Sequence, residues 1–240
     1  MKFYYDFHLH SCLSPCGDND MTPYNLVNMA KILGLDIIAL TDHNTCQNCA
    51  AAMEVGKSIG ITVVPGMELC TSEEVHVVCL FPELKSAESF SEYVLSTVPK
   101  INNRPQIFGD QLIMDSGDGV LGTQELLLTT ASGISIERAV ETVGQYGGVC
   151  YPAHIDRSSY SVLSNLGMIT SEMNFSAVEM TDSADQAEYR KKHPIISDCP
   201  IIVSSDAHYL ENMKEANHSI ELTANSPEAV TDYFKKLIKF

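Results

Sequence analysis

Two histidines, His8 and His10, stand two residues apart at the end of the first apolar segment of the sequence. If residues 2–10 form a β-strand, side chains alternate between its two faces, and both imidazoles project from the same face as Asp6. The opposite face then carries the apolar side chains of Phe3, Tyr5, Phe7 and Leu9. Two imidazoles placed in this way can bind one metal ion, although a short H-x-H pair also occurs on exposed edge strands. The pair therefore needs further ligands from elsewhere in the chain.

Further histidines and carboxylates follow other short apolar segments, each of which has the pattern of a buried strand. The candidates at or just beyond the C-terminal ends of strands are His10, His43, Glu68, His154, Asp206 and His208, while His8 and His76 lie within strands. This set contains six of the eight histidines of the chain. In a parallel α/β barrel the C-terminal ends of the strands carry the catalytic groups. Mixed imidazole and carboxylate ligands indicate zinc, iron or manganese, and so large a set predicts two or three divalent ions that share a bridging carboxylate.

The elements that must position these residues alternate along the chain. Strands are expected at residues 2–10, 37–40, 61–64, 75–81, 149–151, 177–180, 201–203 and 219–222, and helices at 22–33, 45–59, 135–146, 158–166, 184–192 and from 226 onward. This alternation predicts a parallel sheet, open or closed, in one domain covering residues 1–240. Residues 82–135 break the rhythm, and we interpret them as an insertion with short helices at 86–98 and 123–130, because they are too few and too polar to bury a core of their own.

The composition narrows the class of function. The chain has 240 residues, 45% of them hydrophobic, and a formal net charge of −16. Such an acidic chain lacks the positive surface of a non-specific DNA-binding protein, so a long nucleic acid is disfavoured as a partner, although bound metal ions can reverse the sign locally. No apolar run approaches the length of a membrane span and no signal peptide is visible, so we expect a cytoplasmic protein with no membrane partner.

The eight cysteines allow a different kind of metal site. Cys12-x3-Cys16 and Cys46-x2-Cys49 have spacings from which a four-thiolate zinc site can be built, although a helix start also explains the second pair. The others, Cys70, Cys79, Cys150 and Cys199, lie in or beside apolar runs and are expected to pack as small hydrophobic side chains.

Taken in order, the motifs resemble those of the PHP (polymerase and histidinol phosphatase) superfamily. The matching motifs are His8-x-His10, Thr41-Asp42-His43, Gly66-Met67-Glu68 followed by His76, Pro152-Ala153-His154, and Ser205-Asp206-Ala207-His208. The resemblance implies a distorted (β/α)7 TIM-like barrel with a trinuclear metal site at the C-terminal face of the strands, and phosphoesterase chemistry. It also implies that one metal is held by His8, His10, Glu68 and Asp206, a second by Glu68, His76 and His154, and a third by Asp18, His43 and His208.

The ligand Asp18 rests on a loop that departs from the family pattern. The family often has Ser-Asp-Gly a few residues after H-x-H, whereas this chain has the longer segment Pro15-Cys16-Gly17-Asp18-Asn19-Asp20. Counting back from Pro23, at the expected helix start, favours Asp18 over Asp20.

Other polar residues are candidates for supporting roles. Asp6 and Asp42 are interpreted as carboxylates that orient histidine ligands, with a helix N-cap as the alternative for Asp42. Arg157 is placed to bind a substrate phosphate with its planar fork, or is a surface arginine. Glu179 either supports a ligand or faces the barrel interior. His193 and His218 are expected to be structural or surface histidines.

The function expected from these residues is hydrolysis of a small phosphomonoester, such as histidinol phosphate or a nucleotide, by a metal-bridged hydroxide. Asp206, His208 and Arg157 are the candidate catalytic residues. Whether Asp206 or His208 protonates the leaving group stays open, because a metal ligand is a poor proton donor. One alternative is a 3'-5' nuclease or phosphodiesterase of the same superfamily. Another is a non-catalytic, metal-stabilised scaffold or regulatory domain.

Overall fold

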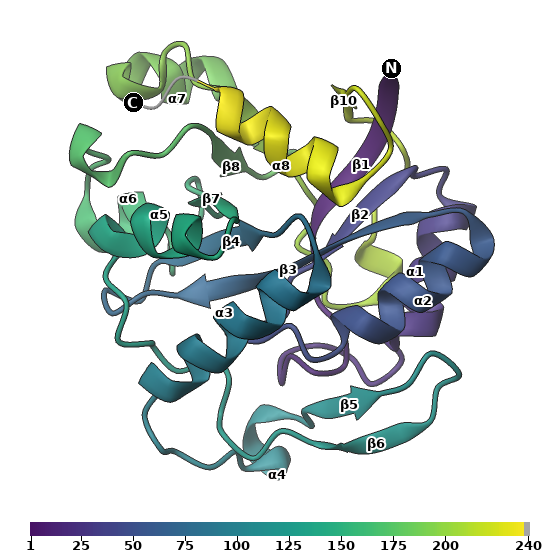
Figure 1. Ribbon diagram of the computed structural model, residues 1–240. Helices are drawn as coiled ribbons and strands as arrows, with labels where there is room; N and C mark the ends of the chain where they lie inside the picture. The colour runs from purple at the N-terminus through teal and green to yellow at the C-terminus, as the bar shows by residue number, and fades with distance from the viewer. Residues whose placement is uncertain (238–240) are drawn as a thin grey trace.

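The computed structural model describes residues 1–237 and centres on one curled sheet (Figure 1). Six strands are hydrogen-bonded in the order β10-β1-β2-β3-β4-β7. Their bounds are Lys2–Leu9 for β1, Ile37–Leu40 for β2, Thr62–Cys70 for β3, His76–Leu80 for β4, Val149–Pro152 for β7 and Ser219–Glu221 for β10. Two smaller two-stranded sheets are formed by β5 (Leu112–Met114) with β6 (Val120–Thr123), and by β8 (Val178–Met180) with β9 (Ile201–Val203).

The helices lie mainly on the outer side of the curled sheet. The longer ones are α1 (Pro23–Ile32), α2 (Cys49–Ile59), α3 (Leu84–Thr97), α5 (Ile136–Gln145) and α8 (Pro227–Lys236). The short ones are α4 (Pro105–Phe108), α6 (Val162–Leu166) and α7 (Gln186–Lys192), with single 3₁₀ turns at Ser171–Met173, Pro194–Ile196 and Leu210–Asn212. Within residues 1–237, no helix combines the length and the apolar character needed to cross a bilayer.

The prediction of a parallel sheet holds for only part of it. Strands β1, β2 and β3 are parallel, but β4 is antiparallel to both β3 and β7, and β10 is antiparallel to β1. The reason is the connection between β3 and β4, residues 71–75, which is too short for a parallel crossover and forms a hairpin. Because β4 runs backwards, its first residue, His76, lies at the same end of the sheet as the last residues of β1, β2 and β7.

The sheet curls into a half-barrel whose open side is occupied by β8 and β9. The backbone N–H of His10 donates to the carbonyl of Ala207 at 3.1 Å, which ties the end of β1 to the segment after β9. On the other side, Ile155 N donates to Glu179 O at 2.9 Å, which brings the segment after β7 to β8. These are single contacts and not strand ladders, so a continuous seven-stranded barrel is not seen in the described residues.

Hydrophobic side chains fill both faces of the curled sheet. Tyr5 and Phe7 pack inside the curl with Tyr151. Helix α8 lies over this inner core (Figure 1) and contributes Phe234, whose ring centroid lies 5.2 Å from that of Tyr151. The second cluster lies between the sheet and the outer helices, and it includes Leu9. Leu9 was expected to share a face with Phe7. That expectation is wrong because the pairing of β1 with β2 shifts register between Asp6 and Leu9, and a bulge breaks the two-residue alternation.

Local sequence explains the start of α1. The Thr22 hydroxyl accepts a hydrogen bond from Asn25 N at 3.1 Å, and Pro23 occupies the first turn, where its missing N–H costs nothing. The helix expected at residues 22–33 is thereby confirmed. Helix α2 instead begins at Cys49, four residues later than expected.

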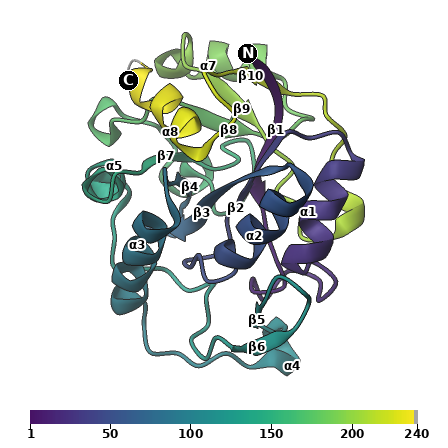
Figure 2. The ribbon, with the colours of Figure 1, turned by 45° about the vertical axis from the view of Figure 1, so that its right-hand side comes forward.

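The insertion, residues 82–135, carries a hairpin that the sequence reading missed. Residues 123–130 were expected to be helical, but the structure has the antiparallel pair β5–β6 followed by turns. The turn between the strands is organised by Asp115, whose carboxylate accepts hydrogen bonds from Gly117 N and Gly119 N at 2.8 and 2.7 Å. Leu112 N also donates to Cys12 O at 2.9 Å, so the insertion packs against the loop after β1 (Figure 2).

Candidate metal centre

The candidate ligands converge at one end of the curled sheet. His8 lies in β1 and His10 just beyond it, while His43 follows β2 and Glu68 lies near the end of β3. Of the other predicted ligands, His76 lies at the start of β4, His154 follows β7, and Asp206 and His208 follow β9. All eight side chains are buried except His208, which is half-buried. The structure therefore brings together eight of the nine predicted ligands.

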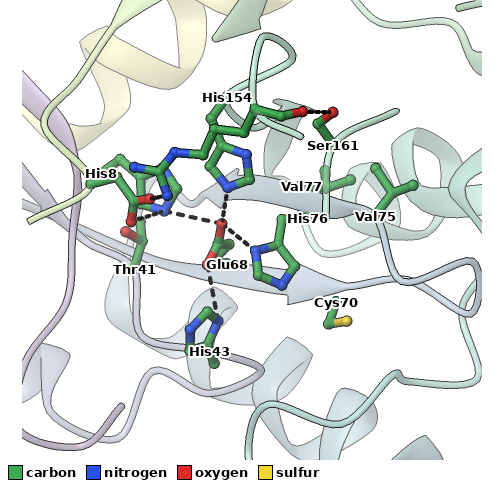
Figure 3. A network of polar contacts seen from close by, with 12 residues as sticks. His8, Thr41, His43, Glu68, Cys70, Val75, His76, Val77, His154 and Ser161 are labelled. Carbon is green, nitrogen blue, oxygen red and sulfur yellow. Dashed lines mark hydrogen bonds and ion pairs between the residues drawn. The ribbon is translucent and has the colours of Figure 1, made fainter. Parts of the chain in front are cut away.

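Glu68 occupies the middle of the cluster (Figure 3). Its Oε1 atom lies 2.8 Å from His76 Nδ1, 3.1 Å from His154 Nε2 and 3.2 Å from His8 Nε2. Its Oε2 atom lies 2.9 Å from His43 Nδ1 and 3.4 Å from His10 Nε2. Each oxygen thus faces its own set of imidazoles, and a carboxylate surrounded in this way can take part in binding metal.

Asp206 faces the same cluster from the β9 side. Its Oδ1 atom lies 3.1 Å from His10 Nε2 and 3.3 Å from His8 Nε2, and Oδ2 lies 2.5 Å from Arg157 Nη1. The ring of His208 stacks on that of His10 with 4.1 Å between centroids.

The donor set fits divalent metal ions. Three groups of side chains offer ligand atoms within 4.8 Å of one another: His10–His43–His208, His8–His10–Glu68 and His43–Glu68–His76. Three buried atoms in this region, His43 Nδ1, His154 Nδ1 and Asp206 Oδ1, have no well-aligned hydrogen bond. Buried polar atoms are rarely left without a partner, and imidazole and carboxylate are the ligands preferred by zinc, iron and manganese.

The two carboxylates are held in the charged form. Burial alone would raise the pKa of Glu68, but His76, His8 and His43 outweigh it and hold that pKa well below its usual range. Burial would likewise raise the pKa of Asp206, and the neighbouring His8 and His10 lower it instead. Both groups are therefore ready to bind a cation without first losing a proton.

Two further contacts orient the histidines of β1. Glu179 in β8 is buried, and its carboxylate oxygens lie 2.9 and 3.1 Å from His8 Nδ1, which leaves Nε2 facing Glu68. His10 Nδ1 lies 2.9 Å from Ser14 Oγ, which in turn donates to Asp42 at 2.7 Å. Carboxylates behind a ligating imidazole fix its tautomer and raise its basicity.

These contacts bear on three acidic residues, of which Glu179 and Asp42 had two interpretations each and Asp6 was interpreted as orienting a histidine ligand. Glu179 supports a predicted ligand. Asp42 acts on His10 through a serine, and it is no N-cap, because α2 starts at Cys49. Asp6 touches no imidazole; its carboxylate accepts hydrogen bonds from the backbone of His8 and Ser205, both at 3.2 Å, and so joins the ends of β1 and β9. Burial raises the pKa of Asp6 to about 6.

Backbone strain accompanies the site. His154 and Asp206 have φ values of +27° and +49°, in the region that residues with a Cβ rarely adopt. Such conformations cost on the order of 1–3 kcal/mol each and persist where surrounding contacts enforce them. For His154 one such contact is its backbone N–H, which donates to Glu179 Oε1 at 3.1 Å.

Comparison with known proteins identifies the family. Residues 6–239 match the PHP domain. The chain belongs to the PHP domain family. The sequence is also 30% identical over 128 residues to the 5'-3' exoribonuclease Rnm of Escherichia coli K12, covering 51% of this chain and 42% of that protein. The other curated relatives are matched over 44%, 28% and 27% of their lengths. This PHP domain therefore spans less than half the length of the curated relatives it matches.

Two solved structures share the fold of this PHP domain. One is endonuclease Q in complex with a 27-mer duplex substrate carrying an abasic lesion, with a TM-score of 0.72, 16% identity, and coverage of 98% of this chain and 57% of that one. The other is an amidohydrolase from Chromobacterium violaceum with bound sulfate, with a TM-score of 0.60, 18% identity, and 98% of both chains covered. At these identities the likeness concerns the fold alone.

A pocket of about 380 Å³ opens above the cluster of this PHP domain. Its walls are formed by Cys16, His43, Glu68, His76, Phe108, Thr129, His154, Arg157, Ser159, Tyr160, Asp206 and His208. Phe108 and Thr129 come from the insertion, so residues 82–135 contribute one wall. Arg157 lines the pocket with a side chain that is 42% exposed and paired with Asp206, which favours the interpretation as a pocket arginine over that as an unrelated surface residue.

In the loop after β1, the residue that faces the cluster is Cys16 and not the expected Asp18. Asp18 Oδ1 accepts a hydrogen bond from Asp20 N at 2.8 Å on the exposed side of the loop, and neither carboxylate lines the pocket. Cys16 Sγ instead lies 3.2 Å from His43 Nε2. The sequence does carry a signal for Cys16. If the family's Ser-Asp-Gly is aligned with Ser14-Pro15-Cys16-Gly17, with one residue inserted, Cys16 stands where the family has the aspartate.

The remaining predicted groups lie elsewhere. A four-thiolate zinc site is not formed, because Cys16 faces His43 while Cys49 Sγ contacts the carbonyls of Leu40 and Gly66. His218 is a surface residue that pairs with Asp182 at 2.9 Å, and His193 lies outside the pocket.

Proposed function

We propose that this PHP domain is a metal-dependent phosphoesterase that hydrolyses a nucleotide-sized phosphomonoester. The observation that carries the proposal is the position of Glu68, whose two oxygens face separate groups of imidazoles on the floor of a pocket that also contains an arginine. A bridging carboxylate of this kind is what a site for closely spaced metal ions requires.

The side chains divide into groups that would hold two of the ions. His8, His10, Glu68 and Asp206 would bind one ion, and Glu68, His76 and His154 a second. Bound divalent ions supply Lewis acidity toward the phosphate and lower the pKa of a water molecule. Glu179 and the Ser14–Asp42 pair keep His8 and His10 in the orientation that this binding needs.

Arg157 is the residue proposed to bind the substrate phosphate. Its guanidinium lies at the edge of the cluster, held by Asp206 Oδ2, and its exposed N–H groups can donate to phosphate oxygens in the pocket. It also supplies positive charge where the protein as a whole is acidic, with 31 acidic against 15 basic residues. Asp206 therefore has two roles in this proposal, as a metal ligand and as the anchor of Arg157.

The pocket walls favour a nucleotide over histidinol phosphate. Tyr160 and Phe108 are 43% and 44% exposed at the pocket, and the Tyr160 ring stacks on His76 with 4.7 Å between centroids. Aromatic faces stack nucleobases with little regard to sequence. The volume of about 380 Å³ also lies within the usual range for sites that bind small molecules.

A second candidate is removal of nucleotides from the end of an oligonucleotide. The similarity to an exoribonuclease over half of this chain favours it. The same similarity weakens the expectation that an acidic chain disfavours long nucleic acids, because that relative is named as a ribonuclease. The same catalytic residues would serve both substrates, and the difference lies in what surrounds the pocket.

The test combines metal analysis with a panel of phosphate esters. Purified protein is loaded separately with Zn²⁺, Mn²⁺ and Fe²⁺ and assayed on 5'- and 3'-nucleotides, histidinol phosphate, ribose 5-phosphate, and short RNA and DNA. We expect phosphate release from nucleotides that is abolished by chelators and by His8→Ala. The matched control is His218→Ala, which removes a surface histidine and should leave both metal content and activity unchanged.

The outcomes separate the candidates. Shortening of oligonucleotides without phosphate release from mononucleotides would replace the phosphatase by the nuclease. Metal-loaded protein that hydrolyses nothing in the panel, or activity that survives His8→Ala, would overturn the proposal and leave the scaffold alternative.

A further inference from the structure

Cys16 lies at the place in the site where the sequence predicted the side chain of Asp18. Its Sγ atom lies 3.2 Å from His43 Nε2, and it lines the pocket together with His208. It is exposed, whereas the other seven cysteines of the chain, all within the described residues, are buried. A single exposed thiol among histidines is a different environment from that of a cysteine packed in a core.

Cys16 faces a cluster of three histidines and a buried carboxylate. His10, His43 and His208 bring ring nitrogens within 4.8 Å of one another. Beside them, Asp206 is 8% exposed, and its Oδ1 atom lies 3.1 Å from His10 Nε2 without any well-aligned hydrogen bond. His43 is 4% exposed; its Nδ1 atom lies 2.9 Å from Glu68 Oε2, and its Nε2 atom is the one that faces Cys16. Three imidazoles gathered beside a thiol, with a buried carboxylate oxygen next to them that lacks a well-aligned hydrogen bond, are the surroundings expected where a cation belongs.

The loop itself fixes which side chain points inward. Asp18 Oδ1 accepts a hydrogen bond from Asp20 N, and Asp18 N donates to His208 O at 2.8 Å, so this residue shapes the turn. The insertion supports the loop from behind. Gly109, at φ +99°, lies so close to Pro15 that a Cβ there would collide with the Pro15 carbonyl oxygen. The backbone at Pro15 is therefore held in place, and with it the side chain that follows.

We infer that Cys16, in place of Asp18, completes the third metal position together with His43 and His208. This inference rests on the proposed metal dependence of the site. Zn–S bonds of about 2.3 Å and Zn–N bonds of about 2.0–2.1 Å place S and N about 3.5 Å apart at a tetrahedral angle. The observed 3.2 Å needs only a small adjustment to reach that geometry.

A sulfur ligand gives this position a metal preference. Thiolates are soft ligands that favour zinc, whereas sites built from carboxylates and water suit manganese. On binding, the S–H bond breaks, the S–Zn bond forms, and the proton passes to solvent. The third position should thus take Zn²⁺ or Co²⁺ in preference to Mn²⁺, and metal should shield the sulfur from alkylating agents.

The test follows the sulfur and not the hydrolysis. Metal-free full-length protein is titrated with Co²⁺, and the near-ultraviolet spectrum is followed for the sulfur-to-cobalt charge-transfer band. The same samples are treated with iodoacetamide, with and without Zn²⁺, and Cys16 alkylation is measured by peptide mass spectrometry. We expect the band in the wild type, in Asp18→Asn and in the control Cys199→Ser, but not in Cys16→Ser. We also expect Zn²⁺ to suppress alkylation of Cys16 at least tenfold.

A second variant keeps the test decisive if Cys16→Ser folds poorly. Cys16→Asp should keep the third metal and its fold, lose the charge-transfer band, and shift its preference toward Mn²⁺. A band that persists in Cys16→Ser, or loss of one bound metal in Asp18→Asn but not in Cys16→Ser, would overturn the inference. Hydrolysis by cobalt-loaded protein without the band would refute the sulfur ligand and leave the proposed function standing. A charge-transfer band without any hydrolysis would support the sulfur ligand and refute the proposed function.

Discussion

The carboxylate of Glu179 is expected to control the affinity of the site for metal, although Glu179 is not among the proposed ligands. Its two oxygens lie 2.9 and 3.1 Å from His8 Nδ1, and Oε1 also accepts the backbone N–H of His154 at 3.1 Å. Glu179→Gln keeps the shape of the side chain but removes the charge and one acceptor oxygen. If the amide oxygen keeps the Oε1 position, it still accepts from His154 N, but the NH2 group then faces the His8 Nδ1–H, donor against donor, and the remaining hydrogen bonds are to a neutral group.

The size of the effect follows from the hydrogen bonds that change. A hydrogen bond to a charged group contributes about 1.5–3 kcal/mol, against about 0.5–1.5 kcal/mol for a neutral one. The substitution should therefore cost the metal bound through His8 about 1–2 kcal/mol, or roughly 5- to 30-fold in affinity. This agrees with the roughly 10- to 100-fold losses that follow the removal of carboxylates behind ligating histidines.

The pH dependence of this difference has a defined sign. Burial lowers the pKa of His8, but Glu179, Asp206 and Glu68 outweigh it and raise that pKa well above the ordinary value in the metal-free protein. Protons therefore compete with metal for His8 more strongly in the wild type than in Glu179→Gln. The loss of affinity in the variant should be larger at pH 8 than at pH 6.

The assay is competition for Zn²⁺ against a chromophoric chelator, at both pH values, on protein whose fold is checked by circular dichroism. Glu188→Gln is the matched control, because Glu188 is exposed, pairs with Lys192 and lies outside the pocket. Zinc affinity in Glu179→Gln within twofold of the wild type at pH 8 would refute the reasoning.

Three further predictions concern the pocket, the exposed thiol and the core. Tyr160→Ala should raise the KM for nucleotides roughly 5- to 150-fold, because stacking contributes about 1–3 kcal/mol per base, while the KM for ribose 5-phosphate is unaffected and Tyr160→Phe behaves as the wild type. Equal losses on both substrates in steady-state kinetics would contradict a stacking role. Partial burial would raise the pKa of the Cys16 thiol, but the charge of His43 and hydrogen bonds from His208 and His43 lower it to about 6. In the metal-free protein, alkylation of Cys16 by iodoacetamide should thus be half-maximal near pH 6, and a midpoint above pH 8 would show that the histidines do not act on the sulfur. Phe234→Ala should lower the free energy of unfolding in urea by about 3–5 kcal/mol, because this 2% exposed ring closes the inner core against Phe7 and Tyr151; Ile32→Ala, at a 78% exposed position, should change it by less than about 0.5 kcal/mol, and a similar loss in both variants would speak against a special role of α8 in the core.

The sequence by itself determined most of the candidate metal centre. His10, His43, Glu68, His154, Asp206 and His208 could be assigned to one site because each lies at or just beyond the end of a short apolar strand, and His8 because it shares a face of its strand with His10. Strands that run in the same direction end at the same edge of a sheet, so position along the chain translates directly into position in space. This local rule does not depend on knowing which strands are neighbours.

Only the tertiary structure decided the features that depend on contacts between distant segments. His76 reaches the site because β4 reverses direction after a short turn, and Glu179 supports His8 because β8 lies against the open side of the curl. The choice between Asp18 and Cys16 is of the same kind. Both lie in one polar loop, and the loop's direction is set by hydrogen bonds to His208 and by close packing against the insertion, residues that are far away in the sequence.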